Sequence, residues 1–291
     1  MSTSIGLNIY SAYRELNNDF IGTLEKIAAM GYQNVELISA NFSTGERFSD
    51  TFSTRTIKEK LDELGLNAFA AHEGVAPGQE IKDGDWDHVL KVNEELGCRS
   101  IVFPMAFIDG YDDTMRVAEQ LNEVGKKCRA AGADFYYHNH AHEFKQLNGT
   151  SLFDLLVKHT DPDYVKFELD LVWVTRGGYD ALAVLEQLGS RCDMIHQKDL
   201  GRQVEHPNVF DVADKAGGVM DIYKNHVKPD DFVNLGTGIV NLESVYQKVE
   251  ELGTIRWAIV ENEGVQGDKF ESLASDLNVM KRYVQGGYIN A

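Results

Sequence analysis

The stretch DTMRVAEQLNEVGKKCRAAGADFYYHNHAHEF, residues 113–144, contains one complete step of a repeated pattern. Residues 113–132 have the apolar spacing of a helix and end at a glycine, which favours helix termination. Residues 134–140 form an aromatic run that is typical of a strand. The strand ends in His138 and His140, and Glu143 follows, so this step predicts a helix, a strand and a group of ionisable side chains at the strand's carboxyl end.

The same alternation runs through all 291 residues. Short β-rich runs predict strands at 4–10, 34–38, 67–72, 100–105, 134–140, 165–170, 192–199 and 255–263. Helical spacing predicts helices at 24–31, 56–65, 85–97, 113–132, 151–160, 180–189, 241–253 and 270–284. Alternating strands and helices in a chain of this length favour a parallel (β/α)₈ TIM barrel.

An open doubly wound sheet is the structural alternative to a barrel. Such a sheet normally carries a glycine-rich phosphate turn after its first strand, and no such turn follows residues 4–10. No linker rich in Pro, Gly or Ser divides the chain, so we expect one domain over 1–291. The connection at about 200–240 is too long for an ordinary loop, and in a barrel it would lie over the catalytic face as a lid.

The charge balance argues against anionic partners. The chain has 28 Lys and Arg against 46 Asp and Glu, a formal net charge of −18. An acidic surface repels phosphate backbones and anionic lipids, so we expect neither nucleic acid nor membrane as a partner. The N-terminal stretch has no signal-peptide pattern, and no run is apolar enough to span a membrane. We therefore expect a cytoplasmic protein, and the three scattered cysteines fit a reducing compartment.

Ligand-type residues end the last predicted strands in succession: His138 and His140, then Asp170, His196 and Glu261. In a barrel these ends converge on one mouth. Two carboxylates with imidazole suit one divalent ion such as Mn²⁺, Mg²⁺, Co²⁺ or Zn²⁺. Each residue alone has an ordinary explanation: a hydrogen-bonded histidine, a helix cap or a salt bridge. Their succession at neighbouring strand ends favours the metal site.

The chain resembles the sugar phosphate isomerases and epimerases with xylose isomerase-like barrels. The resemblance covers nearly the whole sequence and rests on GYQNVEL, YHNHAHEF, FELDLVWVTRGG, IHQKDLG, LGTGIVN and IVENEG. It implies that Asp170, His196 and Glu261 are metal ligands. Epimerases of this family end the fifth strand with a glutamate, where this chain has His138. Either His138 replaces that ligand or Glu143 reaches back from the following turn, and we expect Glu143.

The resemblance implies a metal-dependent isomerase or epimerase of a sugar or keto-sugar, which removes a proton beside a carbonyl. A metal on the ketone oxygen stabilises the enediolate that forms. The alternative is a lyase or dehydratase of a 3-keto-glycoside or inosose, as in the related inosose dehydratases. Histidine suits proton transfer to a leaving oxygen, so we expect His138 and His140 to be catalytic. The resemblance implies the same for Glu261, because epimerases of this family relay the substrate proton through metal-bound glutamates.

Four further residues are candidate substrate contacts: His72, Lys198, Trp173 and Glu36. Packing for Trp173, a salt bridge of Lys198 with Asp170 or Asp199, and structural support for Glu36 are the ordinary alternatives. Two other functions are compatible with a barrel: a nuclease like the abasic-site endonucleases, disfavoured by the charge of −18, and a non-catalytic sugar-binding protein. A homo-oligomer is also compatible with the sequence.

Overall fold

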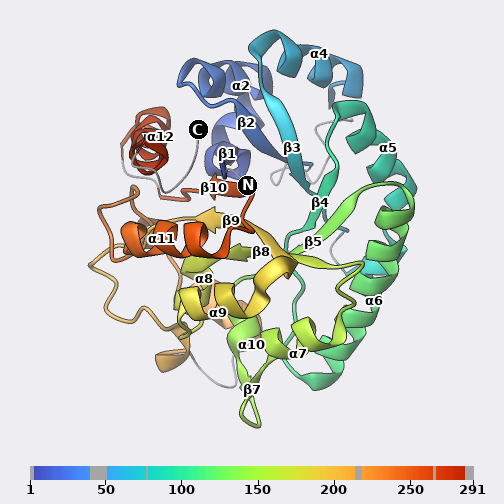
Figure 1. Cartoon of the computed structure of the whole chain (residues 1–291), viewed down its shortest axis with the longest axis vertical. Helices are drawn as coiled ribbons and strands as arrows, with labels where there is room; N and C mark the ends of the chain where they lie inside the picture. The colour runs from blue at the N-terminus through green and yellow to red at the C-terminus, as the bar shows by residue number, and fades with distance from the viewer. Residues whose placement is uncertain (1–2, 40–50, 77, 214–217, 265–266, 286–291) are drawn as a thin grey trace.

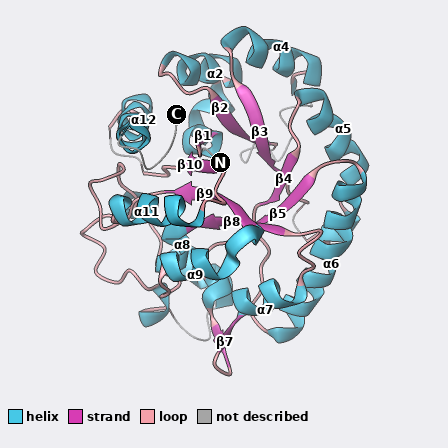
Figure 2. Cartoon of the chain, viewed as in Figure 1, coloured by secondary structure: helices cyan, strands magenta, loops and turns pink. Residues whose placement is uncertain are grey.

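The centre of the molecule is a closed barrel of parallel strands, ringed by helices (Figures 1 and 2). The structure is a computed structural model that describes residues 3–39, 51–76, 78–213, 218–264 and 267–285. The barrel order is β1-β10-β9-β8-β5-β4-β3-β2. Its strands are β1 (Ser4–Asn8), β2 (Asn34–Ile38), β3 (Asn67–His72), β4 (Ser100–Phe103), β5 (Asp134–His138), β8 (Lys166–Asp170), β9 (Cys192–Gln197) and β10 (Trp257–Val260). The (β/α)₈ prediction is confirmed.

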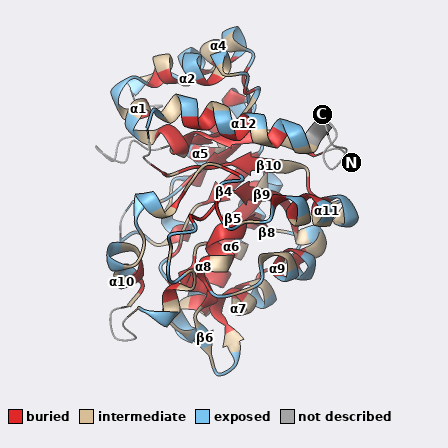
Figure 3. Ribbon diagram, turned by 90° about the vertical axis from the view of Figure 1, so that its left-hand side faces the viewer, coloured by how far each residue is buried: buried red, intermediate tan, exposed pale blue. Residues whose placement is uncertain are grey.

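The helices cover the outside of the barrel with their apolar faces inward, and Figure 3 shows the buried strands between helices whose outer surfaces are exposed. They are α1 (Tyr13–Asn18), α2 (Phe20–Ala29), α4 (Thr54–Leu64), α5 (Trp86–Leu96), α6 (Tyr111–Ala130), α7 (Leu152–His159), α8 (Leu171–Arg176), α9 (Ala181–Leu188), α10 (Gly218–Asn225), α11 (Leu242–Leu252) and α12 (Lys269–Gln285). Asp85 caps α5 by accepting the His88 N–H, as its sequence predicts. Among the described helices, none is long and apolar enough to cross a membrane.

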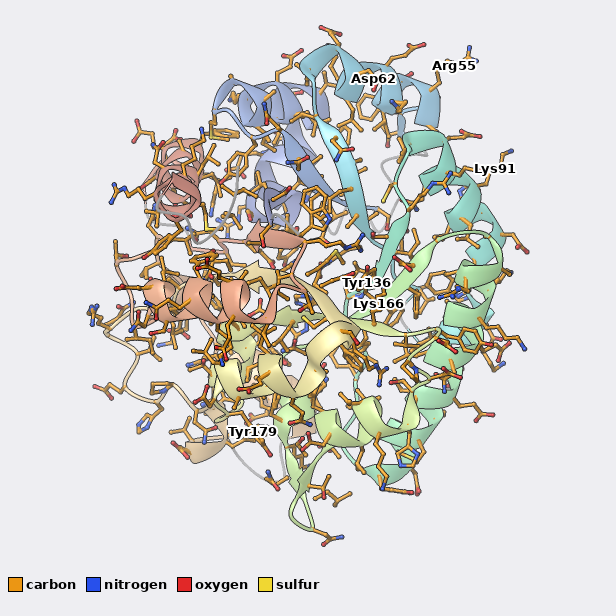
Figure 4. The ribbon with its side chains drawn as sticks, in the orientation of Figure 1. Arg55, Asp62, Lys91, Tyr136, Lys166 and Tyr179 are labelled. Atoms are coloured by element: carbon orange, nitrogen blue, oxygen red, sulfur yellow. The ribbon has the colours of Figure 1, made fainter. Side chains whose placement is uncertain are left out.

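The amino-terminal end of the barrel is closed by packed rings and ion pairs. Phe69 stacks on Trp257 with ring centroids 3.9 Å apart, and the Lys166 ammonium lies 5.5 Å from the centroid of the Tyr136 ring. Figure 4 shows Tyr136 and Lys166 side by side near the barrel centre. Lys166 also pairs with Asp193 at 3.3 Å. Because this end is filled, the open end of the barrel is the one where the strands terminate.

The predicted elements differ from the observed ones mainly at the carboxyl ends of strands. Strands β5, β9 and β10 stop at residues 138, 197 and 260, before the predicted ends at 140, 199 and 263. The polar residues that seemed to extend the strands lie instead in the loops that open the barrel. The six-residue helices α1 and α8 were not predicted, because each is too short to show a helical period. The helix α10, within the long connection, was not predicted either.

The long connection after β9 folds against α8. It includes the 3₁₀ turn η5 (Val209–Asp211), α10 and the turn η6 (Pro229–Asp231). The buried Arg176 side chain of α8 donates hydrogen bonds to the carbonyls of His206, at 3.1 Å, and His226. Leu200, Ile222 and other apolar residues of the connection pack on the rings around Trp173. Figure 3 shows α10 on the side of the barrel opposite the N-terminus, which is the side of the strand carboxyl ends.

Close packing of α6 beside the loop that precedes β8 yields a stability test. A Cβ atom added at Gly125 would lie 2.4 Å from the Tyr164 carbonyl oxygen. We expect Gly125→Ala to lower the free energy of unfolding by about 1–3 kcal/mol, because this overlap outweighs the gain in helix propensity of about 1 kcal/mol. Chemical denaturation measures the change.

Gly74→Ala is the control, since its added Cβ would have its nearest neighbour at 3.9 Å, an ordinary contact. We expect that variant to unfold like the parent protein. A Gly125→Ala variant as stable as the parent would contradict the packing described.

Candidate functional site

Four ligand-type side chains meet at the barrel mouth, and we call them the mouth cluster: His138, Asp170, His196 and Glu261. His138 and Asp170 end β5 and β8, His196 lies in β9, and Glu261 directly follows β10. One ligand atom from each lies within 4.8 Å of the others, and all four residues are buried. The three residues placed together by the sequence, Asp170, His196 and Glu261, are therefore neighbours.

The Asp170 carboxylate leaves one oxygen directed to this cluster. Its Oδ1 caps α8 by accepting the Trp173 backbone N–H at 2.8 Å. Its Oδ2 is buried and accepts no hydrogen bond from the described residues, although the Lys198 ammonium lies 3.3 Å away. Burial raises the pKa of this carboxyl to about 6. A buried oxygen without a hydrogen-bond donor, beside two imidazoles and a second carboxylate, fits a divalent cation.

Next to the mouth cluster lies a second set of groups, which we call the inner layer: Glu36, His72 and Glu168. The two carboxylates are fully buried, and the His72 side chain is 12% exposed. Glu168 Oε2 lies 3.0 Å from His138 Nδ1, 2.9 Å from His72 Nε2 and 3.1 Å from His196 Nε2. Glu36 Oε2 lies 2.7 Å from His196 Nε2. His196 thus connects the two sets, since its Nδ1 faces Glu261 Oε2 at 2.5 Å.

Electrostatic partners determine the charges of the inner layer. Burial alone lowers the pKa of His72, but Glu36 and Glu168 outweigh it and raise that pKa to about 10. His196 behaves in the same way, because the surrounding carboxylates raise its pKa well above the usual value despite burial. The two imidazoles in turn overcome burial to lower the pKa of Glu36. Burial and the charge of Glu36 raise the pKa of Glu168.

Glu143, expected as the fourth metal ligand, lies outside both sets. It belongs to the turn η3 (His142–Phe144) and is fully buried. Its Oε1 accepts the Tyr137 hydroxyl at 2.7 Å, and its Oε2 accepts the His140 backbone N–H at 3.0 Å. The structure therefore uses this carboxylate to fix the turn that carries His140, and His138 occupies the fourth place in the mouth cluster.

His140 lies next to the mouth cluster without belonging to it. Its ring centroid is 5.1 Å from that of His138 and 5.3 Å from that of Trp173. Its Nδ1 is buried with no hydrogen-bond partner in the described part of the chain. Burial and neighbouring positive charge lower the pKa of His140 well below the usual value, which keeps the ring neutral. A neutral imidazole with a free nitrogen can accept a proton.

Lys198 lies between the mouth cluster and the aromatic rings of Trp173 and Phe232. Its ammonium pairs with Asp170 at 3.3 Å, Glu261 at 3.2 Å and Glu263 at 2.5 Å, so the anticipated bridge is to Asp170 and not to Asp199. Asp199 instead accepts backbone N–H groups, among them those of residues 236 and 238. The same ammonium lies 5.1 Å from the centroid of the buried Trp173 ring, which places a cation on the aromatic ring expected to stack on a sugar.

Several site residues were not predicted from the sequence. Glu168 is two residues before Asp170 in β8, so both side chains face the barrel interior. The strand alternates charged and apolar residues, with Lys166, Glu168 and Asp170 at a spacing of two, and this alternation was the available signal. Tyr223, from the long connection, donates its hydroxyl proton to His142 Nδ1 at 2.7 Å, because the Nε2 proton of that ring is directed to the Ala106 carbonyl. No local pattern marks Tyr223.

The fold and the mouth cluster can now be compared with known proteins. Residues 24–283 match the family model described as the xylose isomerase-like TIM barrel. The chain belongs to this family. A segment of 152 residues is 29% identical to the inosose dehydratase of Lacticaseibacillus casei, over 52% of this chain and 48% of that relative. The chain thus spans about half the length of this curated relative.

Two solved structures share the fold over the full chain. A sugar phosphate isomerase/epimerase from Parabacteroides distasonis has a TM-score of 0.75 and 24% identity, covering 100% of this chain and 96% of its own. The IOLI protein with a binding zinc atom has a TM-score of 0.73 and 13% identity, covering 100% of both chains. At these identities the likeness shows the barrel alone.

The positions of Glu143 and Asp170 lead to opposite expectations for metal binding. We expect Glu143→Gln to keep the ion and to lower the free energy of unfolding by about 1–3 kcal/mol, because an amide cannot replace a carboxylate that accepts two hydrogen bonds. We expect Asp170→Asn to lose the ion. Metal content after loading with Mn²⁺ and dialysis, together with denaturation curves, measures both effects. Loss of the ion from Glu143→Gln would identify Glu143 as the ligand.

Proposed function

We propose that this protein is a metal-dependent dehydratase of a neutral cyclic keto-polyol of the inosose class. The observation that carries the proposal is the histidine pair on β5 and its loop: His138 in the mouth cluster and His140 beside it, with a free ring nitrogen. An epimerase of this family would place a glutamate where His138 stands, opposite Glu261. The similarity to a protein named inosose dehydratase supports the same reaction class.

The mouth cluster would hold the ion through His138, Asp170, His196 and Glu261. Two imidazoles and two carboxylates suit Mn²⁺, Co²⁺ or Zn²⁺ better than Mg²⁺, which prefers oxygen ligands. When bound, the ion would polarise the substrate's carbonyl and stabilise the negative charge that develops on its oxygen during proton removal. The burial of these side chains strengthens that electrostatic effect by excluding water.

His140 supplies the proton transfers. Its neutral Nδ1 removes the proton from the carbon beside the carbonyl, and the C–H electron pair forms the enolate double bond. The imidazolium then donates this proton to the hydroxyl on the next carbon. The carbon–oxygen bond breaks, the carbonyl reforms, and the products are a conjugated enone and water. Glu143 and Tyr137 support this step by fixing the turn that carries His140.

The ion pairs of Lys198 favour an uncharged substrate. Three carboxylates, those of Asp170, Glu261 and Glu263, already neutralise this ammonium. A phosphate group would have to displace them or approach several buried negative charges, which is electrostatically costly. A polyol instead offers hydroxyls that can donate to Glu263 and accept from Lys198 without changing the charge of the site.

The long connection at about 200–240 forms a wall of the substrate space in this proposal. Two aromatic residues of the connection, Tyr223 and Phe232, lie edge-on to Trp173. Their ring centroids are 5.8 Å and 5.4 Å, respectively, from that of Trp173. Arg176 anchors the connection by donating hydrogen bonds to two of its backbone carbonyls. A wall that excludes water protects the reactive enolate until the hydroxyl has left.

An isomerase or epimerase of a keto-sugar is the second candidate, since the same ion and the same proton removal begin both reactions. The observation that favours it is Glu261, whose pKa is lowered by Lys198 and His196 despite burial. This carboxylate is charged, lies in the mouth cluster, and could exchange a proton with substrate at a different position from His140.

A dehydration assay tests the proposed reaction. We expect the Mn²⁺- or Co²⁺-loaded protein to convert an inosose to an enone that absorbs in the ultraviolet. We expect His140→Asn to lower kcat by about 10²–10⁴-fold, because the proton acceptor is lost, while the metal content stays that of the parent. His88→Asn, the same substitution at an exposed helical position, should leave kcat unchanged.

Deuterium exchange separates the two candidates. In D₂O, a dehydratase yields the enone, whereas an isomerase or epimerase incorporates deuterium beside the carbonyl and releases no water. Exchange without any elimination, across inososes and 3-keto-glycosides, would replace the first proposal by the second.

A further inference from the structure

We propose that Glu168 and Glu36 are positioning residues that decide which nitrogen of His138 and of His196 faces the metal ion. This inference rests on the proposed metal site and extends it to groups that touch neither ion nor substrate. Both carboxylates are fully buried and lie within hydrogen-bond distance of mouth-cluster histidines. Metal-bound imidazoles generally donate their second N–H to such a carboxylate, which fixes the tautomer and the ring orientation.

The hydrogen-bond partners of each ring indicate which of its two nitrogens would carry the proton and which would bind the ion. A charged carboxylate only accepts hydrogen bonds, so a ring nitrogen within hydrogen-bond distance of it must carry the proton. His138 Nδ1 lies 3.0 Å from Glu168 Oε2, which leaves His138 Nε2 as the metal-binding nitrogen. His196 has a carboxylate oxygen at each nitrogen: Glu36 Oε2 lies 2.7 Å from Nε2, and Glu261 Oε2 lies 2.5 Å from Nδ1. Glu261 belongs to the mouth cluster and Glu36 does not, so an ion bound there would replace the proton on Nδ1, while the proton on Nε2 would remain on the hydrogen bond to Glu36. The two ligands therefore present different nitrogens to the ion.

The two carboxylates are themselves held in place. His72 Nε2 lies between them, 2.9 Å from Glu168 Oε2 and 3.3 Å from Glu36 Oε1. Asn8 donates its side-chain N–H to Glu36 Oε2 at 2.8 Å. Asn8 pairs with Glu36 across β1 and β2, and Glu168 pairs with His138 across β8 and β5. The acceptors thus come from strands of the barrel, whose separation is fixed by backbone hydrogen bonds.

The same residues could instead surround a second cation. Donor atoms of His72, His138, Glu168 and His196 all lie within 4.8 Å of one another, and Glu36 Oε1 and Glu168 Oε1 accept no hydrogen bond from the described residues. With both sites filled, however, His138 and His196 would each have to bind two ions and lose their remaining ring proton. A proton-bearing inner layer predicts one ion per chain, and a second cation site predicts two.

Metal affinity provides the first test, in the full chain and without substrate. We expect one Zn²⁺ per chain, and an affinity about 10–100-fold lower in both Glu168→Gln and Glu36→Gln, because a neutral amide orients the imidazole less strongly. Glu73→Gln is the matched control, since Glu73 is also buried but contacts Asn93 away from the cluster. Competition with a chromophoric chelator measures the affinities, and elemental analysis gives the stoichiometry.

Nitrogen-15 NMR of the histidine rings provides the second test, in the parent protein loaded with Zn²⁺. We expect a proton on Nδ1 of His138 and on Nε2 of His196. The reverse pattern, two ions per chain, or unchanged affinity in both Glu→Gln variants would overturn the inference. If either variant fails to fold, the NMR pattern and the stoichiometry of the parent still decide. None of these measurements involves substrate, so they test the inference even if the protein shows no dehydratase activity.

Discussion

The carboxylates at the barrel mouth are buried, and the cost of keeping them charged there determines the rest of the site. An isolated charge in a protein interior is strongly unfavourable, so each carboxylate needs a cation or hydrogen-bond donors nearby. Lys198 lies beside Asp170 and Glu261, and His196 lies between Glu261 and Glu36. One buried Asp170 oxygen still lacks a hydrogen-bond donor among the described residues, and a divalent ion would supply the missing charge.

Barrel topology converts this local requirement into a layered site. Side chains two residues apart on one strand face the interior at successive depths, as Glu168 and Asp170 do on β8. In the proposed site, the inner layer would orient the imidazoles, and the mouth cluster would bind the ion and the substrate carbonyl. Loops beyond the strand ends add His140, the proposed proton carrier, and the aromatic rings around Trp173. In this proposal the rigid strands would set the ligand geometry, and the loops would determine which reaction follows.

Sequence patterns predict the parts of this arrangement that depend on strand ends. The barrel and the neighbourhood of Asp170, His196 and Glu261 follow from strand–helix alternation alone, because parallel strand ends converge. The fourth member of the mouth cluster could not be predicted in this way, because it depends on the turn η3. There the Tyr137 hydroxyl and the His140 amide hold Glu143 away from the cluster. Such a turn has no periodic signal. Contacts made by the long connection are equally non-local, so Tyr223 could not be found from its neighbours in sequence.

The most direct test of this account is a crystal structure of the protein soaked with Mn²⁺ or Zn²⁺, with an anomalous-difference map. The account predicts one anomalous peak at the barrel mouth, about 2.0–2.2 Å from His138 Nε2, His196 Nδ1 and oxygens of Asp170 and Glu261. A peak bound by Glu143 with His138 turned away would contradict the assignment of the fourth ligand. The absence of any peak near Asp170, His196 and Glu261 would contradict the metal site itself.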